Sequence, residues 1–335
     1  MRRGLSDFWT GVKTAVIRVP SQLISRERPL PVFDPAEQLE HLKLAVQVSG
    51  VNVGDIVLPE DREVTVGKLR LHYLDWGNED QPPLIFLHGG ALTAHTWDVV
   101  CLAMREQYHC LALDARGHGD SDWAEDYGHD RHCEDIGGFI EQLGIRKTVT
   151  IGQSMGGLSS IVYAGRGRER LAGMVIVDVG PELNLGGTKR IGDFIRDTPE
   201  AESIDAFIEK AMEFNPKRDP LLLRRSLLHN LRQMPNGKWS WKWDPNRMRA
   251  GMSKIEDHID AMRQLWTHVE KIDCPALVMR GGKSDVFSDA NAEKLATTLP
   301  NGRWVRIDDA GHTVQGDNPR DMVRELRGFL GEIPF

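Results

Sequence analysis

The sequence predicts an α/β protein with a largely parallel sheet. Short apolar runs, which are typical of parallel strands buried on both faces, recur along the chain at 84–87, 109–113 and 174–178. Segments with helical periodicity alternate with these runs, at 96–105, 133–143 and 158–164. Strand and helix that alternate in this way imply right-handed βαβ units, and such units build a parallel sheet.

Length and composition narrow the functional class. A chain of 335 residues is long enough for one large domain with an insertion or for two modest domains. The formal net charge of -7 gives no reason to expect a nucleic-acid-binding protein. The cysteines are scattered and lack metal-ligand spacing, so we expect free thiols in a reducing compartment: Cys101, Cys110, Cys133 and Cys274. No apolar run is long enough to cross a membrane and no signal peptide is recognisable, so a cytoplasmic protein is expected.

The chain divides into three parts. Residues 1–57 form an N-terminal extension whose segment 5–19 has the pattern of a basic amphipathic helix. That helix is a candidate for a homodimer or membrane-surface contact, and the alternative is an arm packed over its own domain. Residues 58–181 and 275–335 carry the strand pattern, beginning with a hairpin across Gly67.

Residues 182–274 interrupt that pattern with helical segments, so we expect an inserted helical cap. Trp239, Trp241 and Trp243 cluster within it. We expect these side chains to pack inside the cap, and the alternative is an apolar wall for a substrate group.

The motif that carries chemistry is Gly152-Gln153-Ser154-Met155-Gly156-Gly157, which follows a β-branched run. Glycines on both sides of a serine allow a sharp turn between strand and helix that exposes the hydroxyl. We therefore predict that Ser154 is a nucleophile. A serine hydroxyl needs an adjacent base and an acid that orients the base. Asp285 follows a buried strand, and His312 lies on the loop after the last strand, so both are at strand ends where catalytic groups collect.

Five motifs in this order resemble the α/β-hydrolase superfamily, in particular capped serine hydrolases of the esterase and lipase type: His88-Gly89-Gly90, the stretch 114–119, the Ser154 motif, Gly282-Lys283-Ser284-Asp285, and Gly311-His312. The resemblance begins near Glu60. It implies a mostly parallel sheet of eight strands with helices on both faces. It also implies Ser154 as nucleophile, His312 as base and Asp285 as acid, with an oxyanion hole formed by the backbone amides of Gly90 and Met155.

Other residues compete for two of these roles. Asp178 also ends a strand, at an acid position that a minority of related enzymes use, and we favour Asp285 over it. His88, His118 and His132 lie near the same edge. Only His312 has the terminal-loop position, while His88 is expected to orient the oxyanion loop.

The expected activity is hydrolysis of a carboxylic ester through an acyl-enzyme, with a small-molecule ester or lactone as substrate and no cofactor or metal. Alternatives on the same residues are a lactonase and a hydrolase that cleaves a C–C bond in a meta-cleavage product. A third alternative is a hydrolase fold that binds a ligand without turnover.

Overall fold

The computed structural model describes residues 34–167, 170–214, 216, 218–245 and 255–335. The N-terminal helix predicted at 5–19, with its proposed dimer or membrane contact, lies outside these residues. The strands of the described chain are β1 (Glu60–Val66), β2 (Leu69–Asp75), β3 (Pro83–Leu87), β4 (His109–Leu113), β5 (Thr148–Gln153), β6 (Leu171–Val177), β7 (Glu200–Ala201), β8 (Leu231–Gln233), β9 (Trp239–Trp241), β10 (Ala276–Gly281) and β11 (Gly302–Ile307). The helices are α1 (Pro35–Ser49), the 3₁₀ turn η1 (Ala94–Trp97), α2 (Asp98–Met104), α3 (His129–Gln142), α4 (Met155–Ala164), α5 (Leu185–Asp197), α6 (Ile204–Phe214), α7 (Pro220–Asn230), α9 (Ile255–Val269), α10 (Asp289–Thr298), α11 (Val314–Asp317) and α12 (Pro319–Leu330).

The main sheet has eight strands in the order β1-β2-β4-β3-β5-β6-β10-β11. The pairs β1/β2 and β2/β4 are antiparallel, and the other pairs are parallel. The hairpin predicted across Gly67 is confirmed, since Val66 pairs with Leu69 and Gly67 has the positive φ that this turn needs. The predicted α/β class and the mostly parallel sheet are therefore confirmed.

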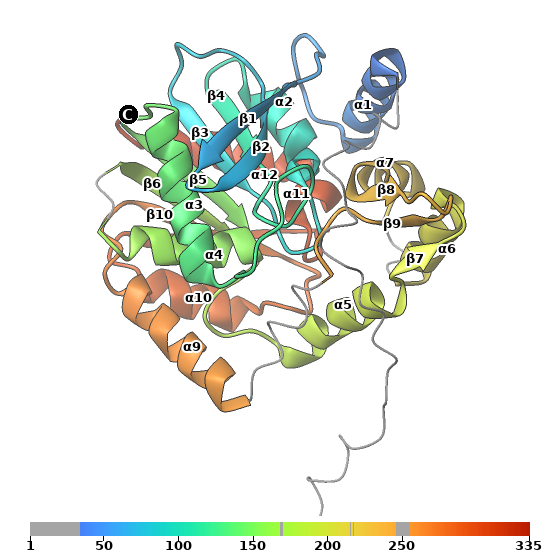
Figure 1. Cartoon of the computed structure of the whole chain (residues 1–335). Coiled ribbons are helices and arrows are strands. Elements are labelled where there is room, and N and C mark those ends of the chain that lie inside the picture. Colours follow the sequence, from blue (N-terminus) through green and yellow to red (C-terminus); the bar gives the residue numbers. More distant parts are fainter. Residues whose placement is uncertain (1–33, 168–169, 215, 217, 246–254) are drawn as a thin grey trace, which may run out of the picture. The chain divides into compact units, whose positions relative to one another are not determined.

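Two apolar cores lie on opposite faces of this sheet because neighbouring residues of a strand point to opposite faces. Leu84 and Phe86 of β3 belong to one core, with residues of α1, α2 and α12. Ile85 and Leu87 of the same strand belong to the other core, with residues of α3, α4, α9 and α10. Figure 1 shows α3 and α4 side by side in front of the sheet. Both faces of the sheet are covered by apolar cores. A catalytic or binding site is therefore expected among the polar loops at the carboxyl ends of the parallel strands.

Between β6 and β10 the chain leaves the sheet. Residues 184–244, called the cap segment below, contain α5, α6 and α7 and a small antiparallel sheet in the order β7-β9-β8, all on one side of the main sheet in Figure 1. The sequence predicted helices here, and these three strands are an addition to that prediction. α9 lies inside the predicted range 182–274, yet its Leu265 and Val269 pack in the core of the main sheet together with α4.

The tryptophans predicted to pack inside the cap do so. Trp241 packs edge-on against Phe207, and its indole N–H donates to Thr198 O at 2.7 Å. The two rings belong to the same apolar cluster as Trp243. Trp241 and Trp243 are thus part of the apolar core of the cap segment, and Trp239 packs against it partly buried.

α1 belongs to the core although the sequence placed it in the N-terminal extension. Leu42 and Val46 of this helix are buried in the core that also holds α2 and α12. Asp34 caps its first turn, and Gly50 ends it in a left-handed conformation.

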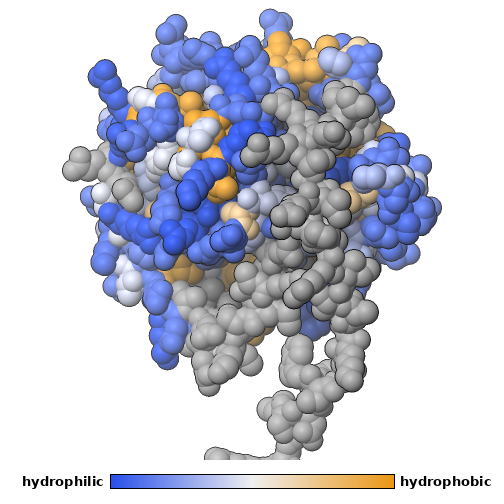
Figure 2. Space-filling model, in the orientation of Figure 1, coloured by the Kyte–Doolittle hydropathy of each residue, from blue (hydrophilic) through white to orange (hydrophobic). Residues whose placement is uncertain are grey.

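The surface of the described residues is mostly polar. On the face drawn in Figure 2, hydrophilic residues predominate and hydrophobic ones form separate patches. No helix among the described residues combines the length and the apolar character that crossing a membrane requires. The large hydrophobic side chains that are exposed lie on different elements: Val48, Leu185, Leu221 and Phe335.

Candidate active site

Ser154 stands on a strained turn between β5 and α4. Its backbone has φ 51° and ψ -117°, which a residue with a side chain rarely adopts. A Cβ at Gly152 would lie 2.5 Å from Gly156 O, and a Cβ at Gly156 would lie 2.4 Å from Leu87 O. Both positions therefore need glycine, and the turn presents Ser154 at the carboxyl end of the sheet.

His312 is paired with a buried aspartate. Its Nδ1 lies 2.8 Å from Oδ2 of Asp178, which directly follows β6 and is fully buried. The backbone N–H of Gly281 donates to Asp178 Oδ1 at 2.9 Å, and the Ser284 hydroxyl donates to Oδ2 at 2.5 Å. The Asp178 carboxylate, held by these two donors, accepts the Nδ1 proton of His312. This leaves Nε2 of the imidazole as a proton acceptor.

Asp285, which the sequence favoured as the partner of His312, does not reach it. Its carboxylate pairs with Arg190 of α5 at 2.9 Å, and 44% of its side chain is exposed. The turn after β10 bends so that Ser284 faces the buried carboxylate, while the backbone of Asp285 packs against Gly187 of α5. The partner of His312 is therefore Asp178, which corrects the choice made from sequence.

The loop after β3 lies against Ser154. A Cβ at Gly89 would lie 3.3 Å from the Cβ of Ser154. The backbone N–H of Ala115 donates to His88 Nε2 at 3.0 Å, so His88 carries its proton on Nδ1 and donates it to Gly89 O at 2.7 Å. Gly89 O and the N–H of Gly90 belong to one peptide, and in a trans peptide they point in opposite directions. His88 thus orients the amide that the sequence assigned to the oxyanion hole.

Comparisons with known proteins identify the family to which the chain belongs. The model of a family described as the alpha/beta hydrolase fold matches residues 82–319. The chain belongs to the α/β-hydrolase family. The esterase Rv0045c of Mycobacterium tuberculosis is 33% identical over 285 residues, which cover 82% of this chain and 90% of that protein. A crystal structure described as that of the novel esterase Rv0045c superposes with a TM-score of 0.72 at 29% identity, covering 90% of this chain and 99% of the other. The sn-1-specific diacylglycerol lipase ABHD11 of Mus musculus is 26% identical over 264 residues, which cover 76% of this chain and 82% of that protein.

In this α/β-hydrolase, Gln153 contributes a contact that the sequence analysis did not predict. Its buried Nε2 donates to His312 O at 3.0 Å, so the side chain ties the loop of the histidine to the turn of the serine. A Cβ at Gly89 would meet Gln153 Oε1 at 2.0 Å, which places the same side chain under the oxyanion loop. The position of Gln153 inside the glycine motif was the signal that could have drawn attention to it.

The competing histidines have structural contacts. His88 holds the loop after β3 as described above, and His118 Nδ1 lies 3.0 Å from Arg116 O with its ring fully buried. The His88 and His118 rings pack edge-on at 5.1 Å. His132 is buried on α3. His312 has the buried carboxylate partner that a general base needs, with Nδ1 2.8 Å from Asp178 Oδ2.

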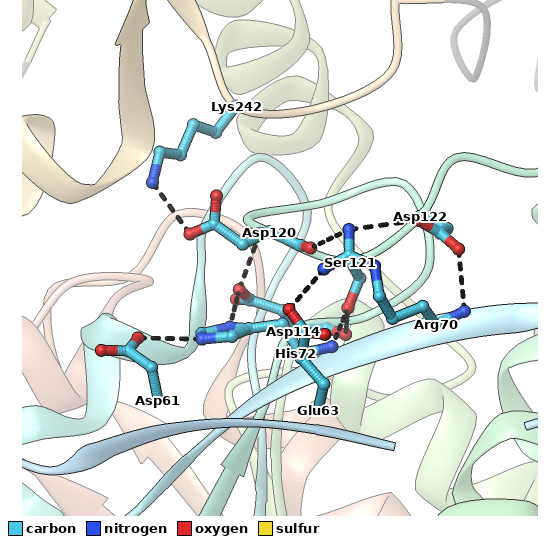
Figure 3. A network of polar contacts seen from close by, with 9 residues as sticks. All are labelled: Asp61, Glu63, Arg70, His72, Asp114, Asp120, Ser121, Asp122 and Lys242. Carbon is cyan, nitrogen blue, oxygen red and sulfur yellow. Dashed lines mark hydrogen bonds and ion pairs between the residues drawn. The ribbon is translucent and has the colours of Figure 1, made fainter. Parts of the chain in front are cut away.

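A polar network around His72 joins β2 to the loop that follows β4 (Figure 3). His72 of β2 is buried between two carboxylates, with Nδ1 2.8 Å from Asp114 Oδ2 and Nε2 2.9 Å from Asp61 Oδ1. Burial alone would lower the pKa of His72, but the hydrogen bonds to Asp114 and Asp61 outweigh it and raise the pKa to about 10. Asp114 also accepts the backbone N–H of Ala94 at 2.7 Å, just after the oxyanion loop. The network therefore anchors that loop on the sheet.

Two groups of described residues place metal-binding atoms close together. The first group is His72, Asp114 and Asp120, whose atoms are taken up by the network of Figure 3. The second group is His95, Asp98 and His229. There the two rings stack face to face at 3.7 Å and 24°, so their in-plane lone pairs do not converge on one point, and Arg225 already pairs with Asp98. Neither group has the arrangement of a cation site.

Proposed function

We propose that this α/β-hydrolase cleaves carboxylic esters through Ser154, His312 and Asp178, with an acyl-enzyme as intermediate. The observation that carries the proposal is the 2.8 Å contact of His312 Nδ1 with the buried Asp178, on a loop that Gln153 ties to the turn of Ser154. The names of the two relatives, an esterase and a diacylglycerol lipase, agree with ester chemistry.

His312 is the general base of the first step. Its Nε2 takes the proton of the Ser154 hydroxyl while Oγ attacks the ester carbonyl carbon, and the carbonyl oxygen becomes an oxyanion. The imidazolium that forms is stabilised by Asp178, which already accepts the Nδ1 proton. Collapse of the tetrahedral intermediate breaks the bond to the leaving alcohol, which receives the proton from Nε2.

Water completes the cycle. His312 takes a proton from a water molecule as the water attacks the acyl-Ser154 carbonyl, and collapse of the second intermediate releases the carboxylic acid and returns the proton to Ser154. The backbone amides of Gly90 and Met155 donate to the oxyanion in both steps. One such donor contributes roughly 3 kcal/mol to the stability of the transition state.

Hydrolysis of p-nitrophenyl esters of increasing chain length tests this proposal. Ser154→Ala is expected to lower kcat by several orders of magnitude, because it removes the nucleophile. Ser160→Ala is the matched control, since Ser160 is a buried serine on α4 whose hydroxyl has no hydrogen-bond partner among the described residues. Its activity should stay near wild type.

A contrary result is as informative. Wild-type protein that hydrolyses none of these esters and is not labelled by a phosphonate at Ser154 would contradict the proposal. Labelling at Ser154 without ester hydrolysis would keep the nucleophile and replace the substrate class, with lactones and C–C substrates as the next compounds to assay.

A further inference from the structure

The cap segment contacts the oxyanion loop directly. Ala91, which follows Gly90 and has a positive φ of 62°, packs against the apolar cluster of the cap that contains Phe207 and Trp241. Two residues further on, the buried Thr93 hydroxyl donates to Oδ1 of Asn230, the last residue of α7, at 3.2 Å. The loop that carries Gly90 is thus held by cap residues as well as by the body of the enzyme.

A second set of contacts joins the same two elements. Arg225 of α7 pairs with the buried carboxylate of Asp98 at the start of α2. His95 Nδ1 lies 3.0 Å from Asp98 Oδ2, and its ring stacks on His229 at 3.7 Å. Arg225 and His229 are four residues apart and therefore lie on one side of α7, and Asn230 follows directly.

The pKa values of Asp98 and His229 are consistent with these contacts between α7 and α2. Burial alone would raise the pKa of Asp98, but His95 and Arg225 outweigh it and lower the pKa, so the carboxylate is charged. Burial, with His95 and the Arg225 guanidinium close by, holds the pKa of His229 well below its usual range. A neutral His229 ring can stack on His95 beside a guanidinium without repulsion.

We propose that α7 is a positioning element for the oxyanion hole, in which Asn230, His229 and Arg225 hold the segment 91–98 and so fix the amide of Gly90. The proposal rests on the proposed function and adds to it, because it makes the cap segment part of the catalytic geometry. These three are positioning residues, because they act through Thr93, His95 and Asp98. A displacement of about 1 Å at a reacting group can cost on the order of 100-fold in rate.

Thr93 gives the sharpest test. Thr93→Val replaces the hydroxyl with a methyl group of similar shape and leaves Asn230 Oδ1 without its donor, whereas Thr93→Ser keeps the hydroxyl. We expect Thr93→Val to lower kcat about 10-fold with KM changed less than about twofold, and Thr93→Ser to restore most of the loss. Affinity for a trifluoromethyl ketone, which forms an oxyanion on Ser154, should fall in parallel with kcat/KM.

The matched control lies one residue from Arg225. Arg224→Gln changes an exposed residue of α7 that pairs with Asp205 on α6, away from the oxyanion segment. It should leave kcat and the inhibitor affinity at their wild-type values. Asn230→Leu supplies a second variant on the cap side of the same hydrogen bond if Thr93→Val does not fold.

Hydrogen exchange of the peptide that spans residues 88–97 tests the inference without an assay of activity. Faster exchange in Thr93→Val and in Asn230→Leu than in Arg224→Gln would support it. Exchange and kcat equal to wild type in Thr93→Val would overturn it. If the wild-type protein hydrolyses no ester, the proposed function fails, and the exchange comparison still decides whether α7 holds the loop.

Discussion

Two aspartates follow neighbouring strands of the sheet, and the turn after β10 decides which one His312 meets. β6 ends at Val177, so Asp178 comes directly off the strand, with a φ of 52° and a carboxylate buried among donors. β10 is followed by a turn that brings Ser284 to that carboxylate and turns Asp285 toward Arg190. The choice depends on the conformation of a few loop residues, and strand periodicity says nothing of that conformation.

Substitution of the two aspartates separates their roles. Asp178→Asn should lower kcat by about 10⁴-fold, because an amide beside Nδ1 no longer stabilises the imidazolium and favours the wrong tautomer. Asp285→Asn should stay within about twofold of wild type, because it removes only a half-exposed ion pair, and such pairs contribute about 0–1 kcal/mol. The measurement is kcat on one p-nitrophenyl ester. A loss in Asp285→Asn with full activity in Asp178→Asn would refute the assignment.

At the scale of elements, the turn of Ser154 after β5 is joined to the loops that follow two other strands. Gly89 follows β3, and His312 follows β11, yet the side chain of Gln153 at the end of β5 contacts both loops. The sequence predicted that these strand ends meet, because the carboxyl ends of parallel strands share an edge. It could not predict that one glutamine links them, because that depends on the rotamer of a buried side chain.

His72 ties β2 to the loop that begins at Asp114, and this gives a pH dependence of stability. The folded pKa of about 10 lies above the unfolded value of 6.5, so the stabilisation is fully present below about pH 6.5 and is lost as the pH rises through 10. The free energy of unfolding should therefore fall over this range, by at most about 1.4 kcal/mol per pH unit from this one proton.

Asp61→Asn tests the assignment, because it removes one of the two carboxylates at His72 and leaves the buried Asp114 in place. Urea unfolding at pH 7, 8 and 9 should show a shallower decline in the variant than in the wild type. The same decline in both proteins would show that His72 is not the group that titrates.

At the scale of the whole molecule, the sequence predicted the mostly parallel sheet and the hairpin. The strands and helices of the main sheet have clear patterns of apolar residues, continuous or of period two in strands and of period 3.6 in helices. Such patterns can be recognised in the sequence alone. The small sheet β7-β9-β8 was missed because strands of two or three residues are too short for a pattern to be detected. The boundary of the cap was missed for another reason: α9 has a helical pattern, and no pattern states whether a helix packs on the cap or on the sheet.

The contacts of the cap segment with the loop after β3 could not be predicted from the sequence either. Thr93 and Asn230 lie 137 positions apart, and neither belongs to a recognisable motif. Long-range hydrogen bonds of this kind are visible only once the fold has brought the two elements together. The hydrogen bond between Thr93 and Asn230 also links the cap segment to the segment that follows β3.

In the proposed mechanism Ser154 forms an acyl-enzyme with a substrate ester. The most direct measurement is mass spectrometry of protein quenched in acid during turnover of p-nitrophenyl acetate, followed by peptide mapping. We expect an acetyl group on the peptide that contains Ser154 in the wild type, and no acetyl group there in Ser154→Ala. Ester hydrolysis that continues in Ser154→Ala, or acetyl groups found only at other residues, would contradict it.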